Sequence, residues 1–150
     1  MPLTMTPDIN VLIAASRSDH PHYKTAYACL NEAIVACADG VSLRLMPMVI
    51  AGFLRLVTNS KVFVQPTPLE HAVGFLDALL AVPGVEIPSI GAEWPMLRQL
   101  CMGKKLSAND IPDAWLAAAV IQLGEHLVTF DTDFRKLLSR TQVTVLVPNP

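Results

Sequence analysis

HLVTFDTDFRKL, residues 126–137, is the stretch that decides how this chain is expected to fold. Its first part is apolar up to Phe130, which is typical of a buried strand, and its last part has the spacing of a short helix. Asp131 and Asp133 stand where the strand ends and the helix begins. In open parallel sheets, ligands gather at the carboxyl ends of strands. The stretch therefore predicts a strand–helix unit with two acids at a ligand-binding edge.

The rest of the chain alternates between the same two kinds of element. Helices are indicated by apolar residues three and four apart and by proline or glycine at their ends, and strands by short β-branched runs. We expect a short first strand ending near Asp8 and further strands at about 41–46, 85–88, 126–130 and 142–147. We expect helices at about 9–15, 20–39, 47–59, 69–82, 93–102, 111–124 and 132–138, with a loop at 103–109.

This alternation predicts an α/β fold with three layers, α/β/α, around a central parallel sheet of about four or five strands. The chain has 150 residues, the length of one ordinary domain, and it contains no internal repeat or low-complexity tract. We therefore expect residues 1–150 to form a single domain.

The composition is apolar for a globular protein. Hydrophobic residues make up 52% of the chain and charged residues 16%, with a mean hydropathy of +0.43. A large core or a buried partner interface is expected, and so a homo-oligomer or a tight complex. The net charge of −2 excludes a general electrostatic attraction to nucleic acid, so any nucleic acid must be held locally.

Targeting signals and cysteine chemistry are not indicated. The apolar stretch from Trp115 to Leu123 is too short to cross a membrane, and the N-terminus lacks the features of a secretion signal. A cytoplasmic location is expected. Cys29, Cys37 and Cys101 are odd in number and form no C-x-x-C motif, so we expect small core residues rather than disulfides or a zinc site.

Three acids fall at equivalent places in the expected sheet. Asp8 follows the first strand, Asp131 follows a later one, and Asp113 lies in the first turn of the helix before that later strand. Carboxylates brought together repel each other unless a hard cation or a proton neutralises them. Because no histidine or thiolate accompanies them, Mg²⁺ or Mn²⁺ is favoured over zinc. Such ions activate water and stabilise charge on a phosphoryl group, which is nuclease chemistry.

The same residues carry a family resemblance. PDINVLIAA at 7–15 resembles the opening of PIN-domain ribonucleases, and IPDAWLAAAVIQLGEHLVTFDTDF at 111–134 resembles their closing signature. MPMVIAGFLRLVTNSKVF at 46–63 resembles VapC toxins, the PIN-domain partners of VapBC toxin–antitoxin pairs. The match covers both ends of the chain in the right order. It implies a PIN-like fold.

The resemblance also implies an activity. It is that of a Mg²⁺- or Mn²⁺-dependent endoribonuclease, the toxin of a toxin–antitoxin pair, which leaves a 5′ phosphate. Asp8, Asp113 and Asp131 would then be the catalytic and metal-binding residues. The expected partners are an RNA substrate, an antitoxin whose tail covers the acidic groove, and a second copy of the chain.

Further residues have supporting roles in this hypothesis. Asn10 and Thr129 would hydrogen-bond the carboxylates and fix their direction. Five basic residues are candidates for contacts with RNA phosphates, since the net charge is too low for a diffuse field: Arg55, Lys104, Lys105, Arg135 and Lys136.

Gly52 is a departure from the family pattern. Many PIN nucleases carry a glutamate there, on the helix after the second strand. Without it the site would hold one metal rather than two, unless Asp110 or Asp133 serves as a further metal ligand. The main alternative is a degenerate PIN module that binds RNA or a protein without cleavage.

Structural roles also account for several of these residues. Asp8 and Asp131 are suitable helix N-caps, and Asp113 suits the dipole of a first turn. Arg55 suits a snorkelling or ion-paired side chain, while Trp94 and Trp115 suit core or interface positions better than base stacking. The D-x-D after a strand also occurs in haloacid dehalogenase-type phosphatases, but there it lies near the start of the chain. A receiver domain would need paired acids after the first strand.

Overall fold

The strands form one parallel sheet with the first strand at its centre. The computed structural model describes residues 4–148, and their five strands lie in the order β3-β2-β1-β4-β5. Every neighbouring pair is parallel. The α/β class and the strand number expected from the sequence are confirmed. The strands are β1 (Thr4–Pro7), β2 (Ser42–Arg44), β3 (Val85–Glu86), β4 (Leu127–Thr129) and β5 (Val143–Val145).

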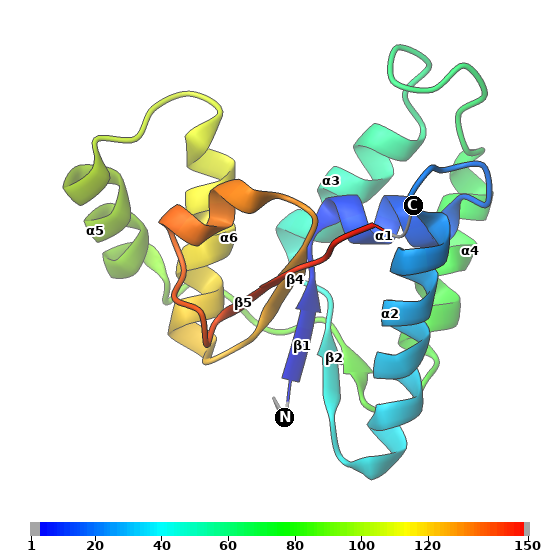
Figure 1. Cartoon of the computed structure of the whole chain (residues 1–150), viewed down its shortest axis with the longest axis horizontal. Helices are drawn as coiled ribbons and strands as arrows, with labels where there is room; N and C mark the ends of the chain where they lie inside the picture. The colour runs from blue at the N-terminus through cyan, green and yellow to red at the C-terminus, as the bar shows by residue number, and fades with distance from the viewer. Residues whose placement is uncertain (1–3, 149–150) are drawn as a thin grey trace.

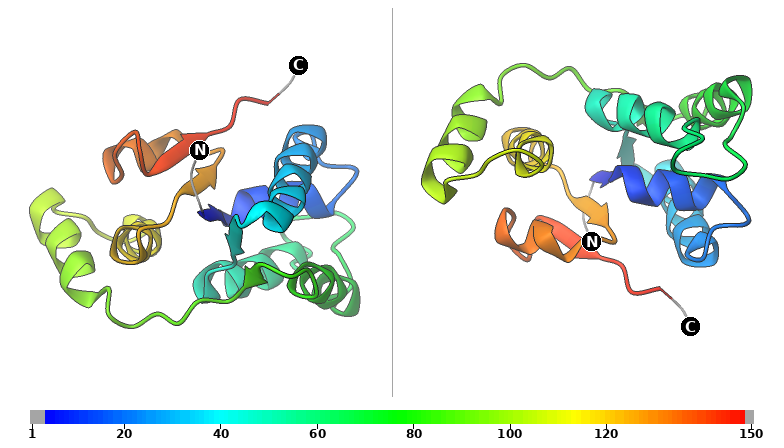
Figure 2. Two further views of the ribbon diagram at one scale, coloured as in Figure 1. Left: turned by 90° about the horizontal axis from the view of Figure 1, so that it is seen from below. Right: turned by 90° about the horizontal axis from the view of Figure 1, so that it is seen from above.

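The helices flank this sheet. In Figure 1, α1 to α4 gather on one side of the strands and α5 and α6 on the other, and both views of Figure 2 show the same division. Their bounds are α1 (Ile9–Ser16), α2 (Tyr23–Ala36), α3 (Pro47–Val57), α4 (Leu69–Leu80), α5 (Trp94–Lys104) and α6 (Asp110–Leu123), with the 3₁₀ helices η1 (Cys37–Asp39) and η2 (Thr132–Lys136).

Two segments differ from the sequence-based expectation. The turn after β4 is a 3₁₀ helix rather than an α-helix, and it ends at Lys136 instead of Leu138. Helix α5 continues to Lys104, into the segment expected to be a loop. It ends where Lys105 adopts the left-handed conformation, with φ 52°, which closes a helix through a backbone bond to Cys101.

The register of β1 and β4 positions the acids. Thr6 pairs with Leu127 and Pro7 with Val128, and the Asp8 N–H donates to the Val128 carbonyl at 2.9 Å. Each strand ends within two residues of this pairing, so the side chains that follow β1 and β4 emerge at the same edge. All three residues of β4 are buried, and they anchor that edge in the core.

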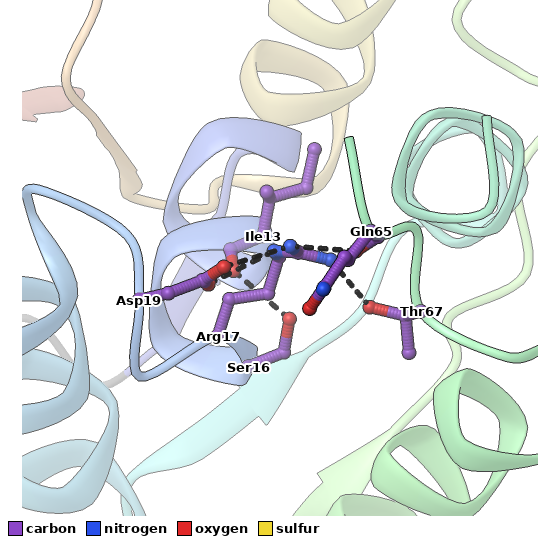
Figure 3. Close-up of polar contacts among 6 residues, drawn as sticks. All are labelled: Ile13, Ser16, Arg17, Asp19, Gln65 and Thr67. Atoms are coloured by element: carbon purple, nitrogen blue, oxygen red, sulfur yellow. Dashed lines mark hydrogen bonds and ion pairs between the residues drawn. The ribbon is translucent and has the colours of Figure 1, made fainter. Parts of the chain in front are cut away.

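Arg17 ties the end of α1 to the segment between α3 and α4. Its guanidinium makes two bonds to the Asp19 carboxylate, at 3.2 and 3.0 Å, and also donates to Thr67 Oγ1 and the Gln65 carbonyl (Figure 3). It also lies 4.0 Å from the centre of the Phe63 ring. The Arg17 side chain is only 9% exposed, so its charge is compensated locally, as a buried cation requires.

The cysteines are less buried than expected. Cys29, Cys37 and Cys101 are free thiols, each partly exposed, and Cys29 and Cys37 pack against the core from its margin. Among residues 4–148, no helix combines the length and the apolar character needed to span a membrane.

Candidate active site

Asp8 is a buried acid at the junction of β1 and α1. It is 7% exposed and has extended backbone geometry, and its Oδ1 accepts the Ile9 N–H at 2.7 Å. Asp8 therefore caps α1, one of the two roles considered for it from the sequence. Burial raises the pKa of Asp8, against the opposing effect of hydrogen bonds from Thr129 and Ile9 and with a further rise from the charge of Asp131. Capping and a role in an acidic site are thus compatible.

Thr129 connects the acids through its hydroxyl group. Its Oγ1 donates to Asp8 Oδ2 at 2.7 Å and accepts the Asp131 N–H at 3.0 Å. Asn10 Nδ2 donates to the same oxygen at 3.3 Å. A hydroxyl has one donor and two acceptor positions, so this buried group is fully satisfied.

Asn10 completes this network from α1. While its amide nitrogen donates to Thr129, its Oδ1 accepts the Phe130 N–H at 3.3 Å. The side chain thus bridges the first turn of α1 and the chain just after β4. Asn10 and Thr129 were both expected to hydrogen-bond the carboxylates; Thr129 bonds Asp8 directly, whereas Asn10 reaches it only through Thr129.

Asp131 begins η2. Its Oδ1 accepts the Asp133 N–H at 2.8 Å, which caps the 3₁₀ helix. The second oxygen of the carboxylate remains available for another partner. Asp133 is exposed and forms an ion pair with Lys136 at 3.6 Å.

The pKa of Asp113 reflects both its burial and the negative charge of the other acids. Its pKa is raised to about 6, first by burial and then by the charges of four other aspartates. They are N-cap or first-turn residues of α1, α6 and η2: Asp8, Asp131, Asp133 and Asp110. The three acids singled out in the sequence therefore converge, together with the two further candidates.

The donor chemistry of this cluster suits a hard cation. It consists of carboxylate oxygens, the ligands that Mg²⁺ and Mn²⁺ prefer, with no histidine or thiolate among them. Within residues 4–148, however, no group of three such side chains is already arranged to hold a metal ion. The pKa of Asp113 is raised first by burial and then by repulsion from the neighbouring carboxylates, and a bound cation would oppose both effects.

Asp113 borders two pockets of different character. One, of about 560 Å³, is mainly apolar and lies between α3 and α6, and Asp8 and Asp113 are its acidic residues. We call it the apolar pocket; its other residues include Met48, Gly52, Arg55, Leu97, Ile111 and Trp115. The second, of about 210 Å³, is the basic-rimmed pocket, formed by Lys104, Leu106, Asp110, Asp113, Asp133, Lys136 and Leu137.

The expected phosphate-binding residues separate into groups. Lys104 and Lys136 line the basic-rimmed pocket beside Asp113, and Arg55 lines the apolar pocket. Arg55 is exposed, and within the described part of the chain it forms no ion pair. Lys105 closes α5 without lining either pocket, and Arg135 lines a separate pocket with Arg140.

Gly52 is in close contact with α1. A Cβ atom at this position would lie 2.4 Å from Ile9 Cδ1 and 3.1 Å from Ile9 Cγ1. Ile9 therefore occupies the space that a larger residue would need. The space in which a side chain at position 52 would begin is filled by Ile9, an apolar residue of the neighbouring helix.

Glu93 is a functional candidate that sequence reasoning missed. This buried carboxylate accepts the Trp115 Nε1–H at 3.0 Å and the Gly91 N–H at 2.6 Å. Burial acts to raise the pKa of Glu93, but these hydrogen bonds outweigh it and the pKa is lowered. Glu93 and Trp115 are 22 residues apart, and no motif in the sequence links them.

The chain that carries these acids matches a known protein family over most of its length. Residues 5–138 match the family described as PIN domain. The chain belongs to the PIN-domain family. Ribonuclease VapC31 of Mycobacterium tuberculosis is 38% identical over 135 residues, which cover 88% of this chain and 92% of that protein. Ribonuclease VapC25 of the same organism is 35% identical over 133 residues, with the same coverage of both chains.

Solved structures show the same PIN fold. VapBC2 from Rickettsia felis, bound to a DNA fragment from its promoter, matches with a TM-score of 0.63 at 19% identity, over 95% of this chain and 98% of that one. VapC20 of Mycobacterium tuberculosis, described as a sarcin–ricin loop cleaving toxin, matches with a TM-score of 0.58 at 15% identity, over 88% and 93%. At such identities the likeness concerns the fold.

Proposed function

We propose that this PIN-domain protein is a metal-dependent endoribonuclease and the toxin of a toxin–antitoxin pair. The observation that carries the proposal is the convergence of carboxylates from three separate elements; burial and then the charges of these neighbours raise the pKa of Asp113 to about 6. Groups held at such an electrostatic cost are concentrated at functional sites. The relatives named VapC ribonucleases support the reaction class.

Asp8, Asp113 and Asp131 would hold Mg²⁺ or Mn²⁺. Asp110 and Asp133 would contribute further negative charge, because both lie close enough to Asp113 to raise its pKa. When bound, such an ion supplies positive charge and activates water toward a phosphodiester. Thr129 and Asn10 hold the Asp8 and Asp131 segments in fixed relation. The chain thereby presents its carboxylates to the cation in one orientation, which limits the reorganisation needed on binding.

RNA binding is assigned to local charges. Lys104 and Lys136 flank Asp113 in the basic-rimmed pocket, where they would contact phosphates on one side of the scissile bond. Arg55 offers a cation on the other side. Lys105 and Arg135 would act farther along the strand, because neither lines a pocket that contains an acid of the site.

The partners follow from the family. An antitoxin that covers the acidic groove, a homodimeric state and action in the cytoplasm complete the proposal, with residues 1–150 as one domain. The relation to VapBC2 and to the VapC ribonucleases supports the antitoxin. The apolar composition and exposed apolar side chains such as Val64 and Leu69 support further protein contacts.

A catalytically degenerate module is the second candidate. It is favoured by Gly52, where many PIN nucleases have a glutamate, and by Ile9, whose side chain fills the space beside it. Such a protein would bind RNA or a protein without cutting.

Cleavage assays separate the two candidates. The protein is incubated with structured RNA in Mg²⁺ or in EDTA, beside Asp8→Asn and the matched control Asp77→Asn, an exposed acid on α4. A nuclease cuts in Mg²⁺ only, leaves 5′ phosphates, retains its activity in Asp77→Asn and loses at least about a hundredfold in Asp8→Asn. Equal residual cleavage in all three proteins would end the nuclease proposal.

A further inference from the structure

We propose that the apolar pocket receives an unpaired nucleobase of the RNA, next to the phosphodiester at the acids, and that Trp115 is the surface on which the base stacks. The inference rests on the proposed function, which places RNA at Asp8 and Asp113. It adds the class of substrate, an RNA with an unstacked base at the cut, and the residues that read it.

The two pockets that meet at Asp113 differ from each other as the base and the phosphate of a nucleotide do. The basic-rimmed pocket offers Lys104 and Lys136, which suit phosphates, whereas most of the apolar pocket offers hydrocarbon surface. A nucleotide also combines an anionic phosphate with a base whose two faces are apolar. With the phosphodiester at the acids, the apolar pocket offers a complementary surface to the base, and the basic-rimmed pocket offers one to the RNA backbone.

Trp115 is fixed as a flat wall of the apolar pocket. Its Nε1–H donates to Glu93 Oε1 at 3.0 Å, so the polar edge of the indole is occupied and its orientation is set. The side chain nevertheless remains exposed, at 39%. An aromatic ring with its hydrogen-bond donor satisfied and its surface open to a pocket is suited to stacking.

Arg55 and Gly52 shape the wall formed by α3. Arg55 brings a guanidinium that forms no ion pair with any of residues 4–148 and can donate to the edge of a base or stack on its face. At Gly52 the wall has no side chain, and Ile9 from α1 fills the place of its Cβ. The pocket of about 560 Å³ is within the range of roughly 300–1,000 Å³ typical of small-molecule sites.

Fluorescence tests the stacking directly. The chain has two tryptophans, so Trp94→Phe leaves Trp115 as the single reporter. Short single-stranded RNAs are titrated with Ca²⁺ in place of Mg²⁺, and then a series in which each position in turn is abasic. We expect RNA to quench Trp115, and one abasic position to abolish the quenching while the RNA still binds.

Matched alanine variants test the energetic role. Trp94 is 62% exposed and does not line the apolar pocket, so Trp94→Ala is the control for Trp115→Ala. Loss of one stacked base should weaken RNA binding by roughly 5- to 150-fold in Trp115→Ala and leave Trp94→Ala unchanged. Trp115→Phe keeps a ring but lacks the Nε1–H bond to Glu93, so it should lose less affinity than Trp115→Ala, and circular dichroism of all three verifies folding.

Mapping of cleavage ends in a random-sequence RNA pool gives the specificity. The unchanged protein should prefer certain bases at one position beside the cut, and Trp115→Ala should lose that preference at that position only. If RNA binds without quenching Trp115, or if Trp115→Ala keeps both affinity and base preference, the inference is wrong and the pocket is left to a protein segment. If the unchanged protein does not cut at all, the proposed function fails instead, while the quenching experiment still decides whether a base enters the pocket.

Discussion

At the scale of single residues, the Thr129 hydroxyl has the largest number of partners in the site. It links Asp8, Asp131 and Asn10 through one buried oxygen, with no position left unsatisfied. Sequence reasoning predicted Thr129 and Asn10 as supports of the carboxylates, because each is two residues from an acid that follows a strand. It could not predict that Asn10 donates to the same Thr129 hydroxyl that donates to Asp8, which depends on the register of β1 against β4.

Replacing Thr129 by valine should therefore impair both stability and activity. Valine has nearly the same shape but leaves the Asp131 N–H and Asn10 Nδ2 without their acceptor and Asp8 Oδ2 without its donor. Urea unfolding should show a loss of about 2 kcal/mol, and RNA cleavage should fall roughly 10- to 100-fold. Thr129→Ser keeps the hydroxyl and should lose much less of both. Indistinguishable serine and valine variants would contradict the role of the hydroxyl.

Asp113→Asn should stabilise the metal-free protein at neutral pH. The folded-state pKa of Asp113, about 6, exceeds the ordinary value of 3.8, so the folded protein binds this proton more tightly than the unfolded chain does. The associated stability is fully present below about pH 4 and is lost as the pH rises through about 6. The variant does not share this loss. Its advantage at pH 7.5 should be on the order of 1 kcal/mol, because the partly exposed carboxylate is screened by water.

The measurement for Asp113→Asn is urea unfolding in EDTA between pH 3.5 and 8. The stability curves of the variant and the unchanged protein should coincide at the acid end, separate progressively between about pH 4 and pH 6, and stay apart by a constant amount above that. Parallel curves over the whole range would show that the carboxylates do not repel one another through Asp113.

At the scale of elements, the alternation of apolar patterns predicted almost every helix and strand. The errors come from local bonds that patterns do not record. The segment after β4 has helical spacing, but Asp131 bonds the Asp133 N–H, two residues on, and the turn tightens into the 3₁₀ helix η2. Helix α5 extends because Lys105 adopts a left-handed conformation that glycine or asparagine usually supplies.

The packing of α1 against α3 makes Gly52 and Ile9 energetically coupled. Gly52→Ala places a Cβ 2.4 Å from Ile9 Cδ1, and Ile9→Val removes that terminal carbon. Alanine gains roughly 0.5–1 kcal/mol of helix propensity, which overpacking opposes in the unchanged background. The alanine substitution should be more favourable by about 1 kcal/mol in the Ile9→Val background.

A double-mutant cycle from urea unfolding of the four proteins measures this coupling. Leu54→Ile, a substitution of equal volume, serves as a control and should combine additively with Ile9→Val, because residues two apart on a helix point to different faces and Gly52 is the one that meets Ile9. If Gly52→Ala also combines additively, the close contact between the two helices does not limit the size of residue 52.

At the scale of the whole molecule, convergence of the acids could be predicted because parallel strands end at one edge. The apolar pocket could not, because it depends on how α3 and α6 are placed across the sheet. The bond from Glu93 to Trp115 likewise joins separate elements with no sequence signature. Local sequence patterns therefore predict the topology, whereas the shape of the pocket depends on packing between distant segments.

Mg²⁺ should stabilise the whole fold, since its proposed ligands lie on three elements. Binding at a hundredfold excess over Kd contributes about 2.7 kcal/mol, which for a chain of this size raises Tm by roughly 5–10 °C. Thermal unfolding with and without Mg²⁺ should show this shift in the unchanged protein and in Asp77→Asn. Asp8→Asn should show little of it, and an equal shift in all three proteins would place the cation elsewhere.

The order in which the chain is synthesised has a consequence for when the acidic cluster can exist. Asp8 and Asp131 are bridged by Thr129, and 123 residues (131 − 8) separate the two acids along the chain. At roughly 5–20 residues per second, a ribosome needs about 6–25 seconds to add the second acid after the first. Throughout that interval a nascent chain carries Asp8 without its counterpart. The cluster forms only after residue 131 has been added, so a copy that is terminated before that residue lacks it.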